Sequence, residues 1–262
     1  MNQVTDQQII EILRKEAVPA LGCTEPVACA LACAKCKEVL GGVPERLDVL
    51  VSGNIYKNGM GVGIPGTGMV GLPIAAALGA VCGKSEYGLE VLKEVNVGDN
   101  LQRAKDMLGQ VTVSLKEDAP DKLYAEALAT KGNDTVKVII AHTHTNIVLV
   151  EKNGEEIFKR EFRLDTSKPE DKGPELSVKR IWDFVHEVDV KDIEFVLQGA
   201  EMNKAISAEG LNSEYGLQIG KTLKENIDKG LLEDDLLNRT LIRATAASDA
   251  RMDGCPKPVM TN

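Results

Sequence analysis

The sequence predicts an α+β protein, with a mainly helical core and an inserted antiparallel β-rich unit. Residues 110–163 hold four runs of β type, and helical periodicity dominates on both sides of them. Strands placed between groups of helices are typical of α+β folds. We therefore expect an N-terminal helical part at 1–109, a β-rich insertion at 110–165, and a C-terminal helical part at 166–262 that packs on the first.

The N-terminal part begins with two predicted helices. Apolar residues at helical spacing predict a helix over 6–16, which Pro19 ends. Thr24 as N-cap and Pro26 in the first turn predict a second helix, which stops at Gly41-Gly42. The other predicted elements here are a strand, a Gly-rich loop and two helices, at 46–53, 54–68, 69–81 and 101–108.

The β-rich unit and the last part follow from alternation and from turn residues. The four β runs are 110–117, 122–130, 135–151 and 155–163. Lys152-Asn153-Gly154 is a hairpin signal, and we expect the long third run to break at 142–146. After a polar linker at 164–175, four helices are predicted, at 176–187, 191–208, 214–227 and 234–252.

Composition narrows the class of protein. Hydrophobic residues at 43% and charged residues at 27% are ordinary for a soluble globular chain. The net charge of −9 and the lack of a basic stripe argue against nucleic acid as a partner. The start is polar, and the most apolar run, at 69–83, is too short to span a bilayer. We expect a cytoplasmic protein without a membrane partner, whose six cysteines are thiols or metal ligands.

Three of the cysteines are close together in the second predicted helix. Cys29, Cys33 and Cys36 follow a C-x3-C-x2-C spacing, which matches the cluster-binding motif of radical-SAM enzymes. Those enzymes carry the motif on a loop, whereas the residues between these cysteines favour a helix. On a helix the first and last sulfur atoms stand about 10 Å apart, too far to bind one cluster. We therefore expect these three cysteines to be buried packing residues.

Cys23 stands apart, because it lies just before the second predicted helix, beside Thr24. The helix dipole and the free N–H groups at such a position lower the pKa of a thiol and favour the thiolate. Position alone leaves two interpretations open, a chemically active thiol and a buried inert one. Glu25 is a first-turn acid, and its simplest role is to complement the dipole.

Residues 61–66, "GVGIPG", have the spacing of a dinucleotide-binding fingerprint. A seven-residue segment separates them from the preceding strand, and Pro65 has no N–H to offer a phosphate. We therefore do not expect a nucleotide here. Gly66, Thr67 and Gly68 are instead predicted to seat an anion such as a carboxylate on backbone N–H groups, with the Thr67 hydroxyl added.

Two further groups of polar residues are candidates. His142 and His144 alternate on one strand face, but no acid is suitably spaced for a metal site, so we expect structural residues at a strand break. Asp249 and Arg251 end an Ala-rich helix. Such a pair either neutralises itself locally or orients a substrate carboxylate, and the sequence leaves both interpretations open.

Four strings occur in order along the chain: "VPALGCTEPVACALA" at 18–32, "KNGMGVGIPGTGMVGLPIAAALG" at 57–79, "HTNIVLVEKNG" at 144–154, and "AASDARMDGCPKPVM" at 246–260. Together they resemble the iron–sulfur L-cysteine desulfidase family, which is related to the α chain of iron–sulfur L-serine dehydratases. The Gly-Cys-Thr-Glu-Pro and Ser-Asp-Ala-Arg-Met strings are the specific ones.

The resemblance implies a lyase of cysteine catabolism, which eliminates sulfide from L-cysteine and leaves pyruvate and ammonia. An L-serine ammonia-lyase is the alternative substrate assignment. The resemblance makes Cys23 the proton acceptor and implies a [4Fe-4S] cluster whose open iron acts as Lewis acid. The residues that we expect to bind the amino acid substrate are Thr24, Glu25, Asn58, Gly66, Thr67, Gly68, His144, Asn146, Asp249 and Arg251.

Two departures from the family pattern matter. Family members usually carry small residues, mostly Ala, at positions 29, 33 and 36, which favours the packing role. They also continue beyond "PVMTN", and the family's cluster cysteines lie in that continuation. We therefore expect a truncated chain without the cluster ligands, and Cys255 does not replace them. An apolar face left exposed favours association into a homo-oligomer. The alternative function is a catalytically silent fragment that binds an amino acid or a partner.

Overall fold

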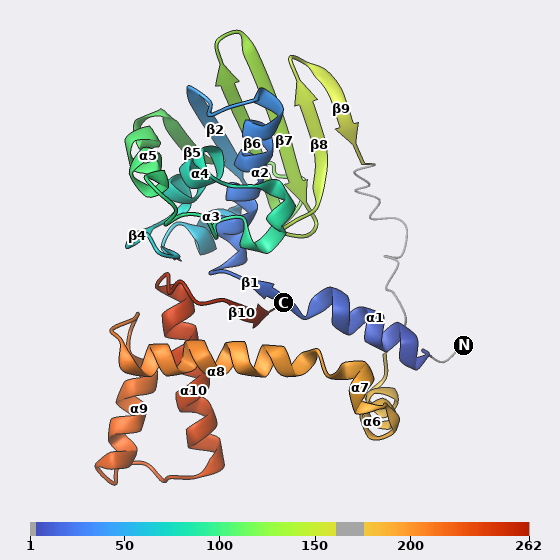
Figure 1. Cartoon of the computed structure of the whole chain (residues 1–262), viewed down its shortest axis with the longest axis vertical. Coiled ribbons are helices and arrows are strands. Elements are labelled where there is room, and N and C mark those ends of the chain that lie inside the picture. Colours follow the sequence, from blue (N-terminus) through green and yellow to red (C-terminus); the bar gives the residue numbers. More distant parts are fainter. Residues whose placement is uncertain (1–3, 161–175, 262) are drawn as a thin grey trace.

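The computed structural model describes residues 4–160 and 176–261, and it confirms a mixed α/β structure (Figure 1). Figure 1 shows a sheet with its helices above and a group of helices below, and the short pair β1–β10 lies where the two parts meet. The helices are α1 (Asp6–Glu16), α2 (Thr24–Leu40), α3 (Gly53–Gly59), α4 (Leu72–Val81), η1 (Ser85–Glu90), α5 (Asn100–Asp106), η2 (Met107–Gln110), α6 (Val178–Glu187), α7 (Val190–Ile193), α8 (Val196–Asn212), α9 (Ile219–Asp228) and α10 (Leu236–Met252). The strands are β1 (Val18–Ala20), β2 (Arg46–Val51), β3 (Gly63–Ile64), β4 (Met69–Val70), β5 (Val111–Leu115), β6 (Tyr124–Lys131), β7 (Asp134–Ala141), β8 (Ile147–Lys152), β9 (Glu155–Lys159) and β10 (Val259–Thr261).

The main sheet has six strands in the order β5-β2-β6-β7-β8-β9. Four of its five pairings are antiparallel, and β2 runs parallel to β5. The sheet therefore differs from the expected antiparallel unit confined to 110–165, because β2 comes from the N-terminal part and lies between two later strands. The expected break in the long β run is confirmed, since β7 ends at Ala141 and β8 begins at Ile147.

Helix α2 is buried along its length between the sheet and other helices. The Cys36 sulfur lies 3.5 Å from the Ala127 carbonyl on β6 and 3.6 Å from the Val136 carbonyl on β7. Cys29, Cys33 and Cys36 have no exposed surface, and burial raises the pKa of Cys29 to about 12. These three cysteines therefore pack in the core, and the continuous helix is not the loop on which radical-SAM enzymes carry their cluster.

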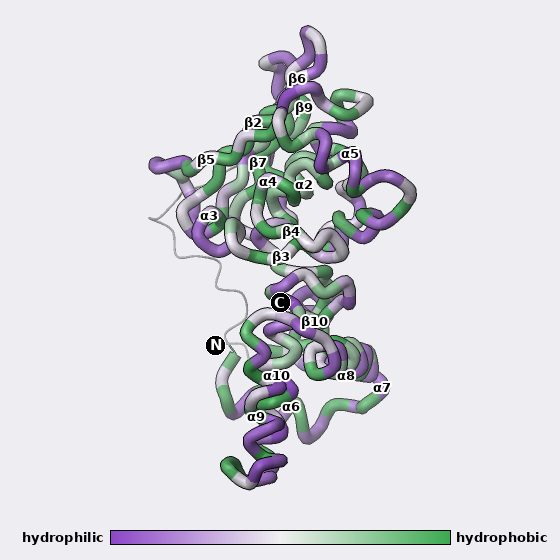
Figure 2. Tube along the Cα trace, turned by 90° about the vertical axis from the view of Figure 1, so that its left-hand side faces the viewer, coloured by the Kyte–Doolittle hydropathy of each residue, from purple (hydrophilic) through white to green (hydrophobic). Residues whose placement is uncertain are grey.

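Helix α4 packs on α2 at unusually short range. A Cβ built on Gly79 would lie 2.1 Å from the carbonyl oxygen of Ala30 in α2. The two backbones approach so closely only because position 79 has no side chain. Figure 2 shows apolar residues gathered around α2, α4 and the adjoining strands. This apolar layer supports the N-terminal end of α2 and the residues located there.

The predicted element boundaries need four corrections. The expected loop at 54–68 contains most of α3 and strand β3, and the next helix starts at Leu72, because Met69 and Val70 form β4, which pairs with β3. The expected helix at 191–208 is two helices, α7 and α8. Helix α9 starts later than expected, after Gly216 and Gln218, both at positive φ. The expected linker at 164–175 lies outside the described residues.

The lower part is built from close helix crossings. A Cβ on Gly210 of α8 would lie 2.0 Å from the carbonyl oxygen of Ala246 in α10, and Gly220 of α9 also packs against α10. Beside them, α6 meets α1, where Arg180 is paired with Asp6 and donates to the Val4 carbonyl at 2.6 Å. Among the helices that the structure describes, none is long and apolar enough to cross a membrane.

Candidate active site

The candidate site lies where the start of α2 meets the end of α10. Cys23 is the N-cap of α2 and makes no side-chain cap bond, so the prediction of Thr24 as N-cap is wrong. The Cys23 sulfur lies 3.1 Å from the sulfur of Met252, the last residue of α10. The Nε of Arg251 donates to the Gly22 carbonyl at 3.1 Å. These two contacts fix the end of α10 against the thiol.

Three polar side chains from different elements surround this junction. The Glu25 carboxylate accepts a hydrogen bond from the Asn58 amide of α3 at 3.1 Å. His144 lies in the turn between β7 and β8, where burial lowers its pKa, Glu25 raises it and Arg251 lowers it. The net effect lowers the pKa of His144, so its imidazole is neutral at pH 7. The site thus combines a thiol, a carboxylate, a guanidinium and a neutral imidazole.

The Gly-rich loop packs directly against both helix ends. Gly66 donates its N–H to the Gly254 carbonyl at 3.2 Å, just past the end of α10. A Cβ on Gly22, at φ +75, would lie 2.7 Å from the Pro65 ring, so this position also requires glycine. The sequence strings at 18–32, 57–79 and 246–260 therefore meet in one place.

The polar groups at the tip of the Gly-rich loop already form hydrogen bonds within the protein. The Thr67 hydroxyl donates to the Ile64 carbonyl at 2.7 Å and accepts from the Met69 N–H at 2.9 Å. The N–H of Thr67 also donates to Ile64. Gly66 and Gly68 both have positive φ and shape the tight turn. A substrate carboxylate seated on this loop stays a prediction, because the N–H groups of Gly66 and Thr67 already have partners.

Two expected site residues make their hydrogen bonds elsewhere. Asn146 donates to the Ala141 carbonyl and accepts from Arg160, which holds the turn between β7 and β8. Asp249 accepts the N–H of Ile219 at 2.8 Å and so binds the start of α9. Of the predicted set, the structure brings together Cys23, Thr24, Glu25, Asn58, His144 and Arg251, with the loop at 66–68 beside them.

The protonation of Cys23 corrects one expectation. Burial raises the pKa of its thiol, whereas its place at a helix start had suggested a lowered value. The positive charge of Arg251 acts in the opposite direction and lowers the pKa, and the negative charge of Glu25 raises it. Cys23 is therefore a thiol at neutral pH, and Arg251 is the neighbour that favours its thiolate.

This balance of charges gives a prediction with opposite signs for two variants. The alkylation rate of Cys23 should rise with pH, with a midpoint above the ordinary thiol value of 9.0. Arg251→Gln removes the charge that lowers the pKa, so the midpoint should move up; Glu25→Gln removes the charge that raises it, so the midpoint should move down. Iodoacetamide labelling followed by peptide mass spectrometry separates Cys23 from the other thiols. Shifts of both variants in one direction would contradict this assignment.

The described residues do not fit an iron–sulfur cluster. Within residues 4–160 and 176–261, no group of three or more His, Cys, Asp or Glu could hold a metal ion. His142 instead lies 2.5 Å from the Asp121 carboxylate. Burial also raises the pKa values of Cys33 and Cys36, which disfavours the thiolates that iron requires. No catalytic step is therefore assigned to a cluster here.

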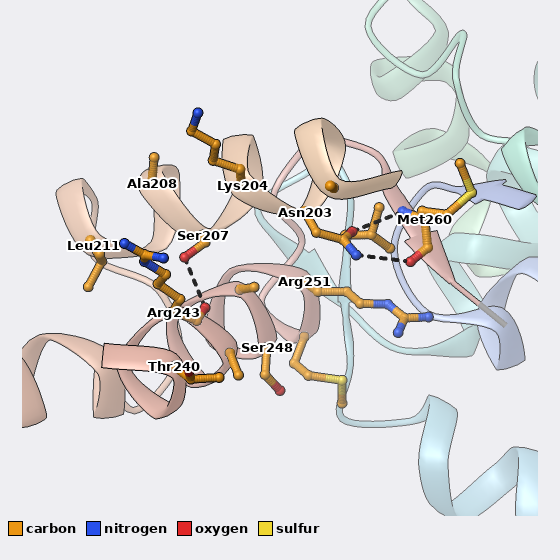
Figure 3. A pocket seen from close by; sticks show the side chains of 15 residues that line it. Asn203, Lys204, Ser207, Ala208, Leu211, Thr240, Arg243, Ser248, Arg251 and Met260 are labelled. Atoms are coloured by element: carbon orange, nitrogen blue, oxygen red, sulfur yellow. Dashed lines mark hydrogen bonds between the residues drawn. The ribbon is translucent and has the colours of Figure 1, made fainter. Parts of the chain in front are cut away.

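Sequence reasoning missed Met252 and the groove beside it. A groove of about 960 Å³ opens between α8, α10 and β10, and Arg251 and Met252 line it (Figure 3). Asn203 of α8 fixes β10 by accepting the N–H of Met260 at 3.0 Å. The Ser-Asp-Ala-Arg-Met string contained the signal for Met252, but nothing local indicated that it would contact Cys23.

A thiol at a helix start, opposite an arginine and beside a carboxylate and a neutral imidazole, defines the site as one suited to proton transfer. Comparison with known proteins identifies a family. A sequence model of the serine dehydratase alpha chain family matches residues 86–262. The chain belongs to this serine dehydratase-like family.

The names of the individual relatives state no activity. UPF0597 proteins of Actinobacillus pleuropneumoniae serotype 3 (strain JL03) and Dichelobacter nodosus (strain VCS1703A) are each 47% identical, over 98% and 99% of this chain and 60% of their own length. A UPF0597 protein of Parabacteroides distasonis is 44% identical over 100% of this chain and 61% of its own. The chain thus spans about 60% of the length of these relatives. No solved structure matches it.

Proposed function

We propose that this chain carries out the proton-transfer step of a β-elimination on L-cysteine, with Cys23 as the group that takes the α-proton. One observation carries the proposal: Cys23 and Arg251, 228 positions apart, meet at the junction of α2 and α10, where the arginine charge favours the thiolate. Membership in the serine dehydratase alpha chain family supports a small amino acid substrate.

The chemistry follows from the groups present. Arg251 keeps guanidinium N–H groups beyond the one given to Gly22, and these suit a substrate carboxylate. Cys23 takes the proton from Cα in its deprotonated form, which is the minor form at neutral pH and which the charge of Arg251 favours, and it then becomes a thiol. The electron pair left on Cα forms a double bond to Cβ and expels the β-substituent as hydrosulfide. The aminoacrylate product then tautomerises to an imine, which water hydrolyses to pyruvate and ammonia.

The neighbours of Cys23 have positioning roles in this proposal. The hydrogen bond from Asn58 holds the Glu25 carboxylate at the N-terminal end of α2, within reach of the substrate ammonium group. L-Serine is the alternative substrate, and it differs only in its leaving group. Hydrosulfide is a far weaker base than hydroxide and therefore a better leaving group. Elimination from L-cysteine thus needs less stabilisation of the departing group than elimination from L-serine does.

Deuterium exchange at the substrate Cα tests the proposal directly. The chain is incubated in D₂O with L-cysteine, L-serine or L-alanine, and the loss of the α-proton signal is followed by NMR. We expect exchange with L-cysteine, accompanied by sulfide and pyruvate, and exchange without product for L-alanine, which has no leaving group. Saturation-transfer signals from bound L-cysteine without any exchange would instead support the second candidate function, a catalytically silent amino-acid-binding chain.

A further inference from the structure

The groove between α8 and α10 has an unusual lining for so acidic a chain. Three cationic residues, Lys204, Arg243 and Arg251, line it, and none of the described residues that line it is a carboxylate. The whole chain carries a net charge of −9. Lys204 and Arg243 form no ion pair with any residue of the described ranges. The groove therefore concentrates positive charge that the described protein does not neutralise.

The shape of the groove suits a helix. Its α8 wall runs from Ala200 to Leu211, about 16 Å at the 1.5 Å rise of an α-helix, or about three turns. Small side chains form much of the lining, and Figure 3 shows them between the longer cationic residues. Ala208, Ala244 and Ser248 are all exposed. Such residues let another backbone approach closely, as Gly210 does where α8 meets α10.

The adjoining surface of α10 is apolar and exposed. Leu236 is 83% exposed, Leu237 is 67% exposed, and Met252 at the Cys23 end is 45% exposed. Exposed apolar side chains next to a groove mark a surface that another segment covers. Because Arg251 and Met252 belong both to the groove and to the candidate active site, whatever covers the groove also closes one side of that site.

We propose that this groove binds a helix with small and apolar residues on one face and carboxylates beside them. That helix belongs to the part of the longer relatives that this chain does not span, about 40% of their length. Charge complementarity with Lys204 and Arg243 and the three-turn length of the α8 wall favour this occupant. This proposal concerns only which segment covers the groove. It therefore stands whether or not the proposed elimination is correct.

Thiol labelling tests the proposal, because every native cysteine in the described residues is buried. Ala244→Cys places a reactive thiol in the groove, and Glu155→Cys places a control on the remote hairpin of β8 and β9. Each variant is made in this chain alone and in a chimera, in which the chain replaces its matched region of the Dichelobacter nodosus relative. We expect maleimide to react at least about tenfold more slowly with Ala244→Cys in the chimera. The Glu155→Cys rate should not change.

Charge reversal and an independent measurement complete the test. Lys204→Glu with Arg243→Glu in the chimera should restore fast labelling of Ala244→Cys. Equal labelling in the chain and the chimera would overturn the proposal. So would protection that appears in the chain alone as its concentration rises, because a second copy would then fill the groove. If the chimera does not fold, hydrogen exchange measured on the natural relative tests whether the groove is covered. Its regions aligned with α8 and α10 must exchange more slowly in the full-length protein than in the matched region alone.

Discussion

Replacing Cys23 with alanine is expected to abolish α-proton exchange on L-cysteine while the chain keeps its fold. The Cys23 sulfur contacts Met252 of α10 at the candidate site, and its environment includes the charge of Arg251. Loss of a general base typically slows proton abstraction by about 10²–10⁴-fold. The exchange rate measured by NMR should therefore fall to the rate of the free amino acid in buffer.

Cys33→Ala is the control, because it removes a buried thiol from the helix that Cys23 caps. Cys33 has no exposed surface and lies two and a half turns inside α2, away from the site. The variant should lose about 1 kcal/mol in free energy of unfolding through the small cavity that it leaves. Its exchange rate should equal that of the unmodified chain.

The two variants together separate chemistry from packing. Thermal and urea unfolding, followed by circular dichroism, should show Cys23→Ala to be as stable as Cys33→Ala or more so. If Cys23→Ala retained the exchange rate of the unmodified chain, Cys23 could not be the proton acceptor. If both variants lost exchange equally, the effect would come from the structure of α2 rather than from one thiol.

Local signals predicted much of the secondary structure. The first helix runs from Asp6 to Glu16 as expected, and α2 ends before Gly41, which takes the left-handed conformation of a helix C-cap. The break between β7 and β8 was also predicted from the sequence. These features depend on neighbouring residues, which propensity and capping describe well. The same locality explains why the packing role of Cys29, Cys33 and Cys36 could be predicted.

Long-range features could not be predicted in the same way. Strand β2 pairs with β5 and β6, and nothing in its own sequence specifies partners more than fifty residues away. The contact between Cys23 and Met252 joins residues 229 positions apart. The raised pKa of Cys23 follows from burial and from the negative charge of Glu25, whereas its position at a helix start suggested the opposite direction. The sequence therefore indicated candidate residues, but it did not indicate which of them lie together or how their charges act on Cys23.

Replacing Gly79 with alanine is expected to lower the free energy of unfolding by about 2 kcal/mol or more. The new Cβ would lie 2.1 Å from the carbonyl oxygen of Ala30 and 2.7 Å from its carbonyl carbon. Overpacking of this kind typically costs about 1–3 kcal/mol, and more when no side chain can move aside. The better helix propensity of alanine offsets only about 1 kcal/mol of that cost.

Two companion variants identify the cause of this loss. The short contacts involve the Ala30 backbone, so the double variant Gly79→Ala with Ala30→Gly should remain destabilised. Gly109→Ala is the matched control, since a Cβ there meets no atom within 4 Å, and its stability should change by less than about 1 kcal/mol. Urea denaturation of the three variants measures each value. Recovery of stability in the double variant would show that side-chain crowding, rather than the approach of the α2 and α4 backbones, limits position 79.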